Sequence, residues 1–339
     1  MDFSQAAQKV LDNKTKPVGS LGRLEEVAVR LATLQQTLQP SVAKKRLFVF
    51  AGSHGVTASG VSLYPAAVTG QMVRNFVGGG AAINVLARLG GIDLRVIDVG
   101  VDDDLSDIKA DNFFKCRIRN GTRNFVEEPA MTAEECDAAI EVGRAQAGES
   151  LAQGVQLLGV GEMGIGNTTS ASALVAGLKI VPAEESTGRG TGMDEGGVAL
   201  KARVVAKALE FHRAARTAKD WLRCVGGYEV AAMTGVILEA AERRVPVVVD
   251  GFISTAAAAI AIAMEPGAGE VCFFGHCSHE KAHRKVLDHL GAEPLLDLRM
   301  RLGEGTGAAL AMHIIDASAR VMCEMASFEQ AGVSRSETV

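Results

Sequence analysis

Short runs of consecutive apolar residues recur along the chain, separated by longer stretches in which apolar residues follow a helical period. The runs span 47–51, 94–99, 155–160, 246–250, 271–275 and 294–298. Most are continuous rather than alternating, as in strands that are covered on both faces. Helical periodicity predicts helices over 68–76, 81–89, 133–152, 171–178, 198–212, 229–241, 252–264 and 279–290. Strand–helix alternation predicts an α/β fold, a doubly wound parallel sheet of about six strands.

The two ends of the chain differ from this pattern because they carry no strand-like run. Residues 4–39 predict two helices around the break KTKPVGSLGRLEE, in which Ser20 or Gly22 begins the second helix. We expect residues 1–40 and 305–339 to pair as a small helical domain. Residues 41–304 then form a large α/β domain that carries most of the site, with 102–130 as a long surface excursion.

Composition narrows the classes of partner. The 339 residues include 35 basic and 40 acidic side chains, a net charge of −5, with no basic cluster. Nucleic-acid binding is not expected, since it needs a positive surface. The longest apolar run, 252–264, is too short to span a bilayer, and the start of the chain has no signal-peptide core. Six scattered cysteines without CxxC spacing indicate reduced thiols and a cytoplasmic protein.

Chemistry is expected in the loops that follow the strands, because ligands of open α/β sheets bind beyond the carboxyl ends of the strands. These loops are GSHGV, VGVDDD, GVGEMGIGNTT, DGFIST, GHCSHE and MRLGEGTG. The third, 159–169, contains Gly161 and Gly164 and enters a helix with Asn167, Thr168 and Thr169 as candidate N-caps. Free N–H groups and hydroxyls there suit a phosphate, although a tight structural turn is the alternative. It matches neither a Walker loop nor GxGxxG.

Three further motifs are weaker. His279 to His283 matches HExxH, a zinc pattern if both histidines share a helix face, but no third ligand is evident and a polar helix start fits equally well. Ser53-His54 follows a strand without the GxSxG turn of a serine hydrolase. The glycine-rich stretch 186–197 suits a lid, a second anion loop or a linker.

The stretch 300–310, MRLGEGTGAAL, places one carboxylate, Glu304, between Gly303 and Gly305. A loop of this kind that feeds a helix lets a ligand approach the backbone closely. Taken alone, it fits a solvated turn as well as a site.

Seven blocks together resemble nicotinate-nucleotide–dimethylbenzimidazole phosphoribosyltransferases. They are KPVGSLGRLE, HGV with GVSLYPAAVTGQM, GVGEMGIGNTT, GRGTG, VVVDGFIS, HCSHE and MRLGEGTGAALA, in that order between residues 16 and 311. The resemblance implies transfer of phosphoribose from nicotinate mononucleotide to 5,6-dimethylbenzimidazole for the lower ligand of cobalamin. It also implies a Rossmann-like sheet, a small helical domain from both termini, a homodimer, and neither metal nor cofactor.

The same resemblance gives roles to residues. Glu304 takes the position of the catalytic base, and Glu162 and Lys201 match positions that assist. We expect the phosphate among residues 161–169, with help from 303–307.

The flat acceptor base is expected near Tyr64, Pro65 and Met72. The chain departs from the family at Ser53, where a carboxylate is common, and Tyr64 and Met72 lie where members vary. A different acceptor, such as adenine or a phenol, and a non-catalytic binder of nucleotides are the alternatives.

Overall fold

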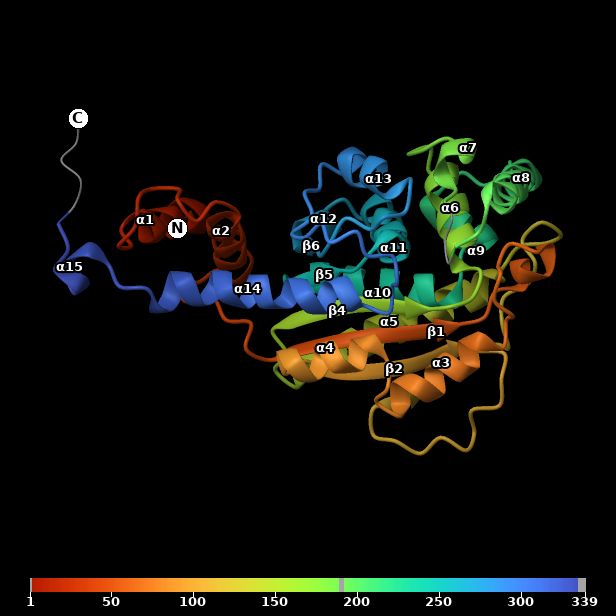
Figure 1. Ribbon diagram of the computed structural model, residues 1–339, viewed down its shortest axis with the longest axis horizontal. Helices are drawn as coiled ribbons and strands as arrows, with labels where there is room; N and C mark the ends of the chain where they lie inside the picture. Colours follow the sequence, from red (N-terminus) through yellow and green to blue (C-terminus); the bar gives the residue numbers. More distant parts are fainter. Residues whose placement is uncertain (1, 189–191, 335–339) are drawn as a thin grey trace.

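A computed structural model describes residues 2–188 and 192–334, and its centre is one parallel sheet (Figure 1). The strand order is β3-β2-β1-β4-β5-β6. The strands are β1 (Lys45–Gly52), β2 (Asp93–Gly100), β3 (Phe113–Lys115), β4 (Leu157–Met163), β5 (Val247–Val249) and β6 (Cys272–Phe274). All five strand pairs are parallel, so the prediction of a doubly wound sheet is confirmed.

Helices cover both faces of the sheet, which explains why the strands are apolar on both sides. Helices α3, α4 and α14 pack on one face, and α5 and α10 on the other, with α11 beside α10 (Figure 1). Their bounds are α3 (Val68–Val77), α4 (Ala82–Gly90), α5 (Ala133–Ala152), α10 (Tyr228–Arg243), α11 (Phe252–Met264) and α14 (Thr306–Glu324). The predicted bounds of α5 and α11 agree with the structure to the residue.

Further helices lie mostly beyond the carboxyl ends of β4 to β6. They are α6 (Asn167–Gly177), α7 (Ala183–Ser186), α8 (Glu195–Phe211), α9 (Ala218–Val225), α12 (Ala268–Val271) and α13 (His283–His289), and η1 (Gly55–Ser59) follows β1. Helix α12 is the exception, because it directly precedes β6 at its amino end. The helix predicted at 171–178 begins earlier, at Asn167, and its N-cap is Gly166 rather than a polar side chain. Helix α9 was not predicted.

Two strand-level predictions were wrong. Residues 294–298 form no strand and contribute one isolated bridge, Leu296 to His276. The sixth strand is β3, which lies inside the predicted surface excursion 102–130 and pairs with β2 over three residues. Strand β3 has the sequence FFK, with only two apolar residues, and so offers no apolar run like those that contain the equally short β5 and β6. PLLDL is apolar because it covers the end of β6.

The chain ends meet in a second, smaller core. Ala7, Leu11, Ala28, Ala32 and Met322 pack together, from α1 (Phe3–Asp12), α2 (Arg23–Gln35) and the end of α14. As predicted, Gly22 is the residue before α2. Helix α14 starts on the sheet and runs out to this core, and α15 (Phe328–Ala331) follows it (Figure 1). We propose that the small and large domains share α14 instead of separating at residue 305.

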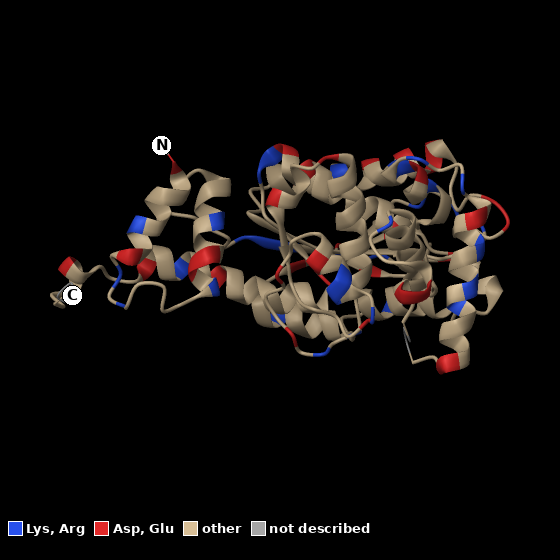
Figure 2. Ribbon diagram, turned by 90° about the horizontal axis from the view of Figure 1, so that it is seen from above, with Lys and Arg blue, Asp and Glu red and all other residues tan. Residues whose placement is uncertain are grey.

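Charged residues of both signs are intermixed over the helices (Figure 2), in keeping with the small net charge. Within 2–188 and 192–334, no helix combines the length and apolar character needed to cross a membrane.

Candidate active site

A cavity of about 790 Å³ opens beyond the carboxyl ends of β4 and β5. Its walls come from the loops after β4, β5 and β6, from 300–306, and from one face each of α3 and α4. Of the residues predicted to form the site, eight line this cavity: Tyr64, Met72, Glu162, Gly164, Asn167, Thr168, Gly303 and Glu304. The loops GSHGV and VGVDDD, also expected to carry chemistry, do not line it.

Glu304 sits at the centre of an unusual turn. Gly303, Glu304 and Gly305 have φ angles of 82°, 62° and 84°, so three consecutive residues adopt the left-handed region. Glycine adopts it freely, but a glutamate does so at a cost of about 1–3 kcal/mol unless its surroundings hold it. Gly161 in β4 allows those surroundings to close, because a Cβ there would lie 2.6 Å from the Cα of Gly305.

The Glu304 carboxyl group is buried and only partly satisfied. The side chain is 6% exposed, and one oxygen accepts the backbone N–H of Ile83 in the first turn of α4. Its Oε2 has no hydrogen-bond partner among the described residues. Burial, with the charge of Asp250, raises the pKa of Glu304 to about 7, against the opposing effect of the Ile83 N–H. A carboxylate with this pKa is a competent general base near neutral pH.

Glu162 is a second buried carboxyl group in the same cavity, and it is more fully engaged. Its Oε2 accepts a short hydrogen bond from Asn167 Nδ2, and its Oε1 lies against Gly303, where a Cβ would collide with it. Burial, then the charges of Asp250 and Glu229, raise the pKa of Glu162 to about 8. Its pKa is thus raised further than that of Glu304.

Lys201 reaches the site through another residue. It lies on α8, and its Nζ donates to Thr168 Oγ1 over 2.9 Å at the first turn of α6. Burial lowers the pKa of Lys201, which Glu280 partly offsets. Lys201 itself does not line the cavity, nor do Gly161, Thr169 and Gly305, which lie beneath its wall, or the exposed Pro65.

Apolar side chains make up the wall opposite the carboxyl groups. Val68 and Met72 come from α3, Leu86 from α4 and Phe252 from α11, and Tyr64 stands half exposed at the rim. An apolar wall facing a few convergent polar groups is the usual construction of a site for a flat heterocycle.

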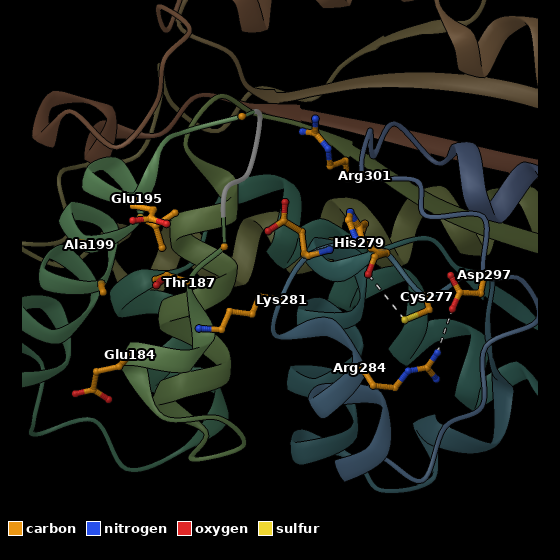
Figure 3. A pocket seen from close by; sticks show the side chains of 16 residues that line it. Glu184, Thr187, Glu195, Ala199, Cys277, His279, Lys281, Arg284, Asp297 and Arg301 are labelled. Carbon is orange, nitrogen blue, oxygen red and sulfur yellow. Dashed lines mark hydrogen bonds and ion pairs between the residues drawn. The ribbon is translucent and has the colours of Figure 1, made fainter.

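A second cavity, of about 1000 Å³, adjoins the first and shares Ser278, Glu280 and Arg301 with it. Lys281 points into the space between α8 and the segment after β6, and Arg284 faces Asp297 beside it (Figure 3). Its rim includes Gly188 and Gly192. Residues 189–191 of the GRGTG block, and with them part of the expected lid 186–197, lie outside the described residues.

The HExxH motif does not form a zinc-binding helix face. Helix α13 begins only at His283, so His279 precedes it. His283 Nδ1 accepts the Ser278 N–H over 2.8 Å and its Nε2 lies 2.9 Å from Thr255 Oγ1. Both ring nitrogens are thus engaged, and burial lowers the pKa of His283 to about 3. Among the described residues, no three His, Cys, Asp or Glu side chains are grouped to hold a metal ion.

The Ser53-His54 pair is structural. Ser53 Oγ accepts the Asp102 N–H over 3.0 Å and lies away from the cavity lining. His54 Nε2 lies 2.6 Å from Glu229 Oε1, with both side chains fully buried. The His54–Glu229 pair packs beneath the cavity, since a Cβ on the cavity-lining Gly164 would lie 3.2 Å from the His54 ring.

The sequence predicted the loops after β5 and β6 as parts of the site and singled out the HExxH motif after β6, but it gave Asp250 and His276 no role in the site. Asp250 and His276 line the cavity and are 1% and 2% exposed. The available signal was Asp250 itself, a carboxylate directly after the apolar run VPVVV. Leu86 was missed for a different reason, since nothing in its sequence surroundings separates a cavity wall from a core.

Comparison with known proteins agrees with this geometry. A family model described as "Phosphoribosyltransferase" matches residues 1–333. The nicotinate-nucleotide–dimethylbenzimidazole phosphoribosyltransferase of Geotalea uraniireducens is 51% identical over 98% of this chain and 94% of its own, and that of Geobacter sulfurreducens is 49% identical with the same coverage. The crystal structure of CobT from Thermus thermophilus superposes with a TM-score of 0.95 at 45% identity, covering 99% of this chain and 100% of that one.

Proposed function

The chain belongs to the nicotinate-nucleotide–dimethylbenzimidazole phosphoribosyltransferase family, and on that premise we propose how its cavity moves phosphoribose from nicotinate mononucleotide to 5,6-dimethylbenzimidazole. The observation that carries the proposal is Glu304, a buried carboxyl group in a strained turn with one oxygen left without a partner among the described residues. The products are α-ribazole 5′-phosphate and nicotinate.

The reaction needs a single base. Nicotinate departs from C1′ as a neutral ring nitrogen, taking the bonding electron pair, so no acid is required to protonate it. One nitrogen of the benzimidazole forms the new bond to C1′ from the opposite face, which inverts this carbon. The proton on the other nitrogen becomes acidic as that bond forms, and Glu304 accepts it. Base catalysis contributes roughly 10²–10⁴-fold, and positioning both substrates contributes the remainder.

Other residues are proposed to hold the substrates. The apolar wall at Met72 and Leu86, with Tyr64 at the rim, takes the flat acceptor. The start of α6 takes the phosphate, where the Lys201 ammonium already donates to Thr168. Glu162 acts as a neutral carboxyl group that orients Asn167 and the Gly303 turn, so that Glu304 alone accepts the proton.

A direct test is Glu304→Gln, assayed for nicotinate release from nicotinate mononucleotide with dimethylbenzimidazole. We expect kcat to fall by roughly 10²–10⁴-fold while the donor still binds, because glutamine cannot accept the proton. Glu141→Gln, an exposed position on α5, is the matched control and should leave kcat unchanged. Near-normal turnover by Glu304→Gln would remove Glu304 from the role of base.

Acceptor choice is a separate question, and adenine or a phenol remains the alternative to dimethylbenzimidazole. Tyr64 and Met72 line the same cavity as Glu304, which supports a role for both in acceptor choice. Competition among purified bases, with products identified by mass, tests it. If none of the bases supports release of nicotinate, a non-catalytic nucleotide binder is favoured instead.

We also propose a homodimer located in the cytoplasm. In support, α4 exposes Val85 and Leu89, and Leu63 and Leu302 are exposed near the cavity. All six cysteines are unpaired. Light scattering that gives the mass of one chain would contradict the dimer, and cell fractionation tests the location.

A further inference from the structure

The Glu304 turn is held from outside by a carboxylate on a neighbouring strand end. Asp250 directly follows β5, is 1% exposed, and faces the first turn of α14. Its Oδ2 accepts the Gly305 N–H over 3.1 Å and its Oδ1 accepts the Ala308 N–H over 2.9 Å. These donors lie one and four residues beyond Glu304, so a single carboxylate spans the turn that presents the base.

Resting on the proposed function, we propose that Asp250 is a positioning residue for the reaction. It fixes the left-handed turn that points Glu304 into the cavity, and its negative charge makes Glu304 a stronger base.

The geometry of the turn shows why it needs such a support. Glu304 has a φ of 62°, a conformation that a non-glycine residue keeps only when neighbouring groups impose it. The first N–H groups of a helix have no partners within the helix, and Asp250 supplies partners for two N–H groups at this end of α14, those of the N-cap Gly305 and of Ala308. A carboxylate at this end of the helix also interacts favourably with the helix dipole.

The chain also leaves room for the support. His276 Nε2 lies 3.8 Å from Asp250 Oδ1, and a Cβ on Gly307 would overlap the His276 ring. Two glycines, Gly161 and Gly307, therefore allow β4 and His276 to close around the turn. Both oxygens of Asp250 accept N–H groups, which favours the ionised form, although burial raises the pKa of Asp250.

The electrostatic part depends on every charge that faces Glu304. Glu162 comes from β4, Asp250 from the end of β5, His276 from the end of β6, and Glu280 and Arg301 line the same cavity. Of these groups, Asp250 is the one that raises the pKa of Glu304, after burial itself.

The test compares Asp250→Asn with the wild-type enzyme in the pH dependence of kcat for nicotinate release. Wild-type kcat should rise with pH around a midpoint near 7, as Glu304 ionises. In Asp250→Asn the midpoint should move about one pH unit toward acid, because a negative charge beside the base is gone. The maximal kcat should also fall by about ten-fold or more, because the turn is less well positioned.

Asp98→Asn is the matched control. Asp98 is another buried strand-end aspartate, whose Oδ1 accepts the N–H groups of Gly100 and Val101, but it does not line the cavity. Its loss should lower the thermal midpoint without moving the pH midpoint of kcat. An active Asp250→Asn enzyme whose pH midpoint of kcat matches that of the wild-type enzyme would overturn the inference. Nicotinate release by the unmodified enzyme tests the proposed function independently.

A second variant separates position from charge and applies even if Asp250→Asn does not fold. Ala308→Pro removes one N–H that Asp250 accepts, leaves the carboxylate in place, and puts proline in the first turn of a helix, where it is tolerated best. We expect kcat to fall about three- to ten-fold, with both KM values and the pH midpoint unchanged. If Ala308→Pro keeps the kcat of the wild-type enzyme, the hydrogen bond from Ala308 to Asp250 does not position the base.

Discussion

The ends of β2 and β5 each carry a buried aspartate that accepts two backbone N–H groups, but the charges around the two aspartates differ. Asp98 accepts those of Gly100 and Val101 at and directly beyond the end of β2, whereas Asp250 accepts those of Gly305 and Ala308 at the distant start of α14. Asp98 also pairs with the Arg117 guanidinium, whose Nη2 lies 2.8 Å from Oδ2. Asp250 instead has the His276 imidazole nearby, at 3.8 Å.

This difference in charge distinguishes the turn at Asp98, to which we give a structural role, from the turn that holds Glu304, the proposed base. The charge of the buried Asp98 carboxylate is balanced by the Arg117 guanidinium. Around Asp250 two further buried carboxyl groups, Glu162 and Glu304, share the cavity, and Asp250 contributes to the raised pKa of both. Burying carboxyl groups costs stability, but it raises the pKa of Glu304 toward neutral, which suits its proposed role as the base.

Three substitutions would sharpen this comparison, beginning with the one that should disturb the β5 side most. Gly161→Ala would drive a Cβ into the backbone of residues 304 and 305. Overpacking of this kind costs about 1–3 kcal/mol, and displacement of Glu304 should lower kcat by roughly 10- to 100-fold. Nicotinate release and chemical denaturation measure the two effects.

Gly148→Ala is the control for Gly161→Ala. A Cβ at Gly148 in α5 would lie 3.6 Å from Glu239 Oε1, an ordinary contact. The free energy of unfolding of this variant should rise by about 0.5–1 kcal/mol, because alanine is more stable than glycine in a helix interior, and kcat should not change. Equal kcat in the two alanine variants would mean that the Glu304 turn tolerates movement.

The next effect concerns pH and stability at β4. The folded pKa of Glu162 is about 8, well above its usual value of 4.5, so between these values the folded state binds more protons than the unfolded state. Its contribution to stability is therefore lost as pH rises from about 4.5 to 8. Glu162→Gln mimics the protonated form, and its free energy of unfolding should fall less between pH 5 and 8 than that of the wild type.

Glu149→Gln provides the comparison for that slope. Arg95 holds the pKa of Glu149 below its usual range, so Glu149 titrates below this pH window in both folded and unfolded states. The variant should keep the wild-type slope between pH 5 and 8. If Glu162→Gln also keeps it, Glu162 is not protonated in the folded enzyme at neutral pH.

The smallest change in activity is expected at β2. Arg117→Met removes the guanidinium that pairs with Asp98 and leaves that carboxylate buried without this cation. We expect a loss of about 1–3 kcal/mol in the free energy of unfolding and no change in kcat or its pH midpoint. A shift of the pH midpoint would mean that the two strand ends are electrostatically connected.

The architecture was readable from the sequence wherever elements are long and their pattern is strong. Helix α11 was predicted to the residue because its largely apolar segment begins directly after Gly251 and ends directly before Glu265. The strands β1, β2 and β4 were recognisable because burial on both faces demands continuous apolar residues. The short strands β5 and β6 were recognisable because each lies within a longer apolar run, whereas β3 and the start of α13 were not, since a few residues outside such a run carry no period.

The sequence by itself determined the alternation of strands and helices, four of the loops that line the cavity, and Glu304 as an isolated carboxylate between two glycines. Tertiary structure alone decided which loops share a cavity, because that depends on strand order rather than chain order. It brought Asp250, fifty-four residues before Glu304 in the chain, to the turn that presents the base. It also set the pKa of Glu304 near 7, since burial and neighbouring charges exist only once strands from distant parts of the chain lie side by side.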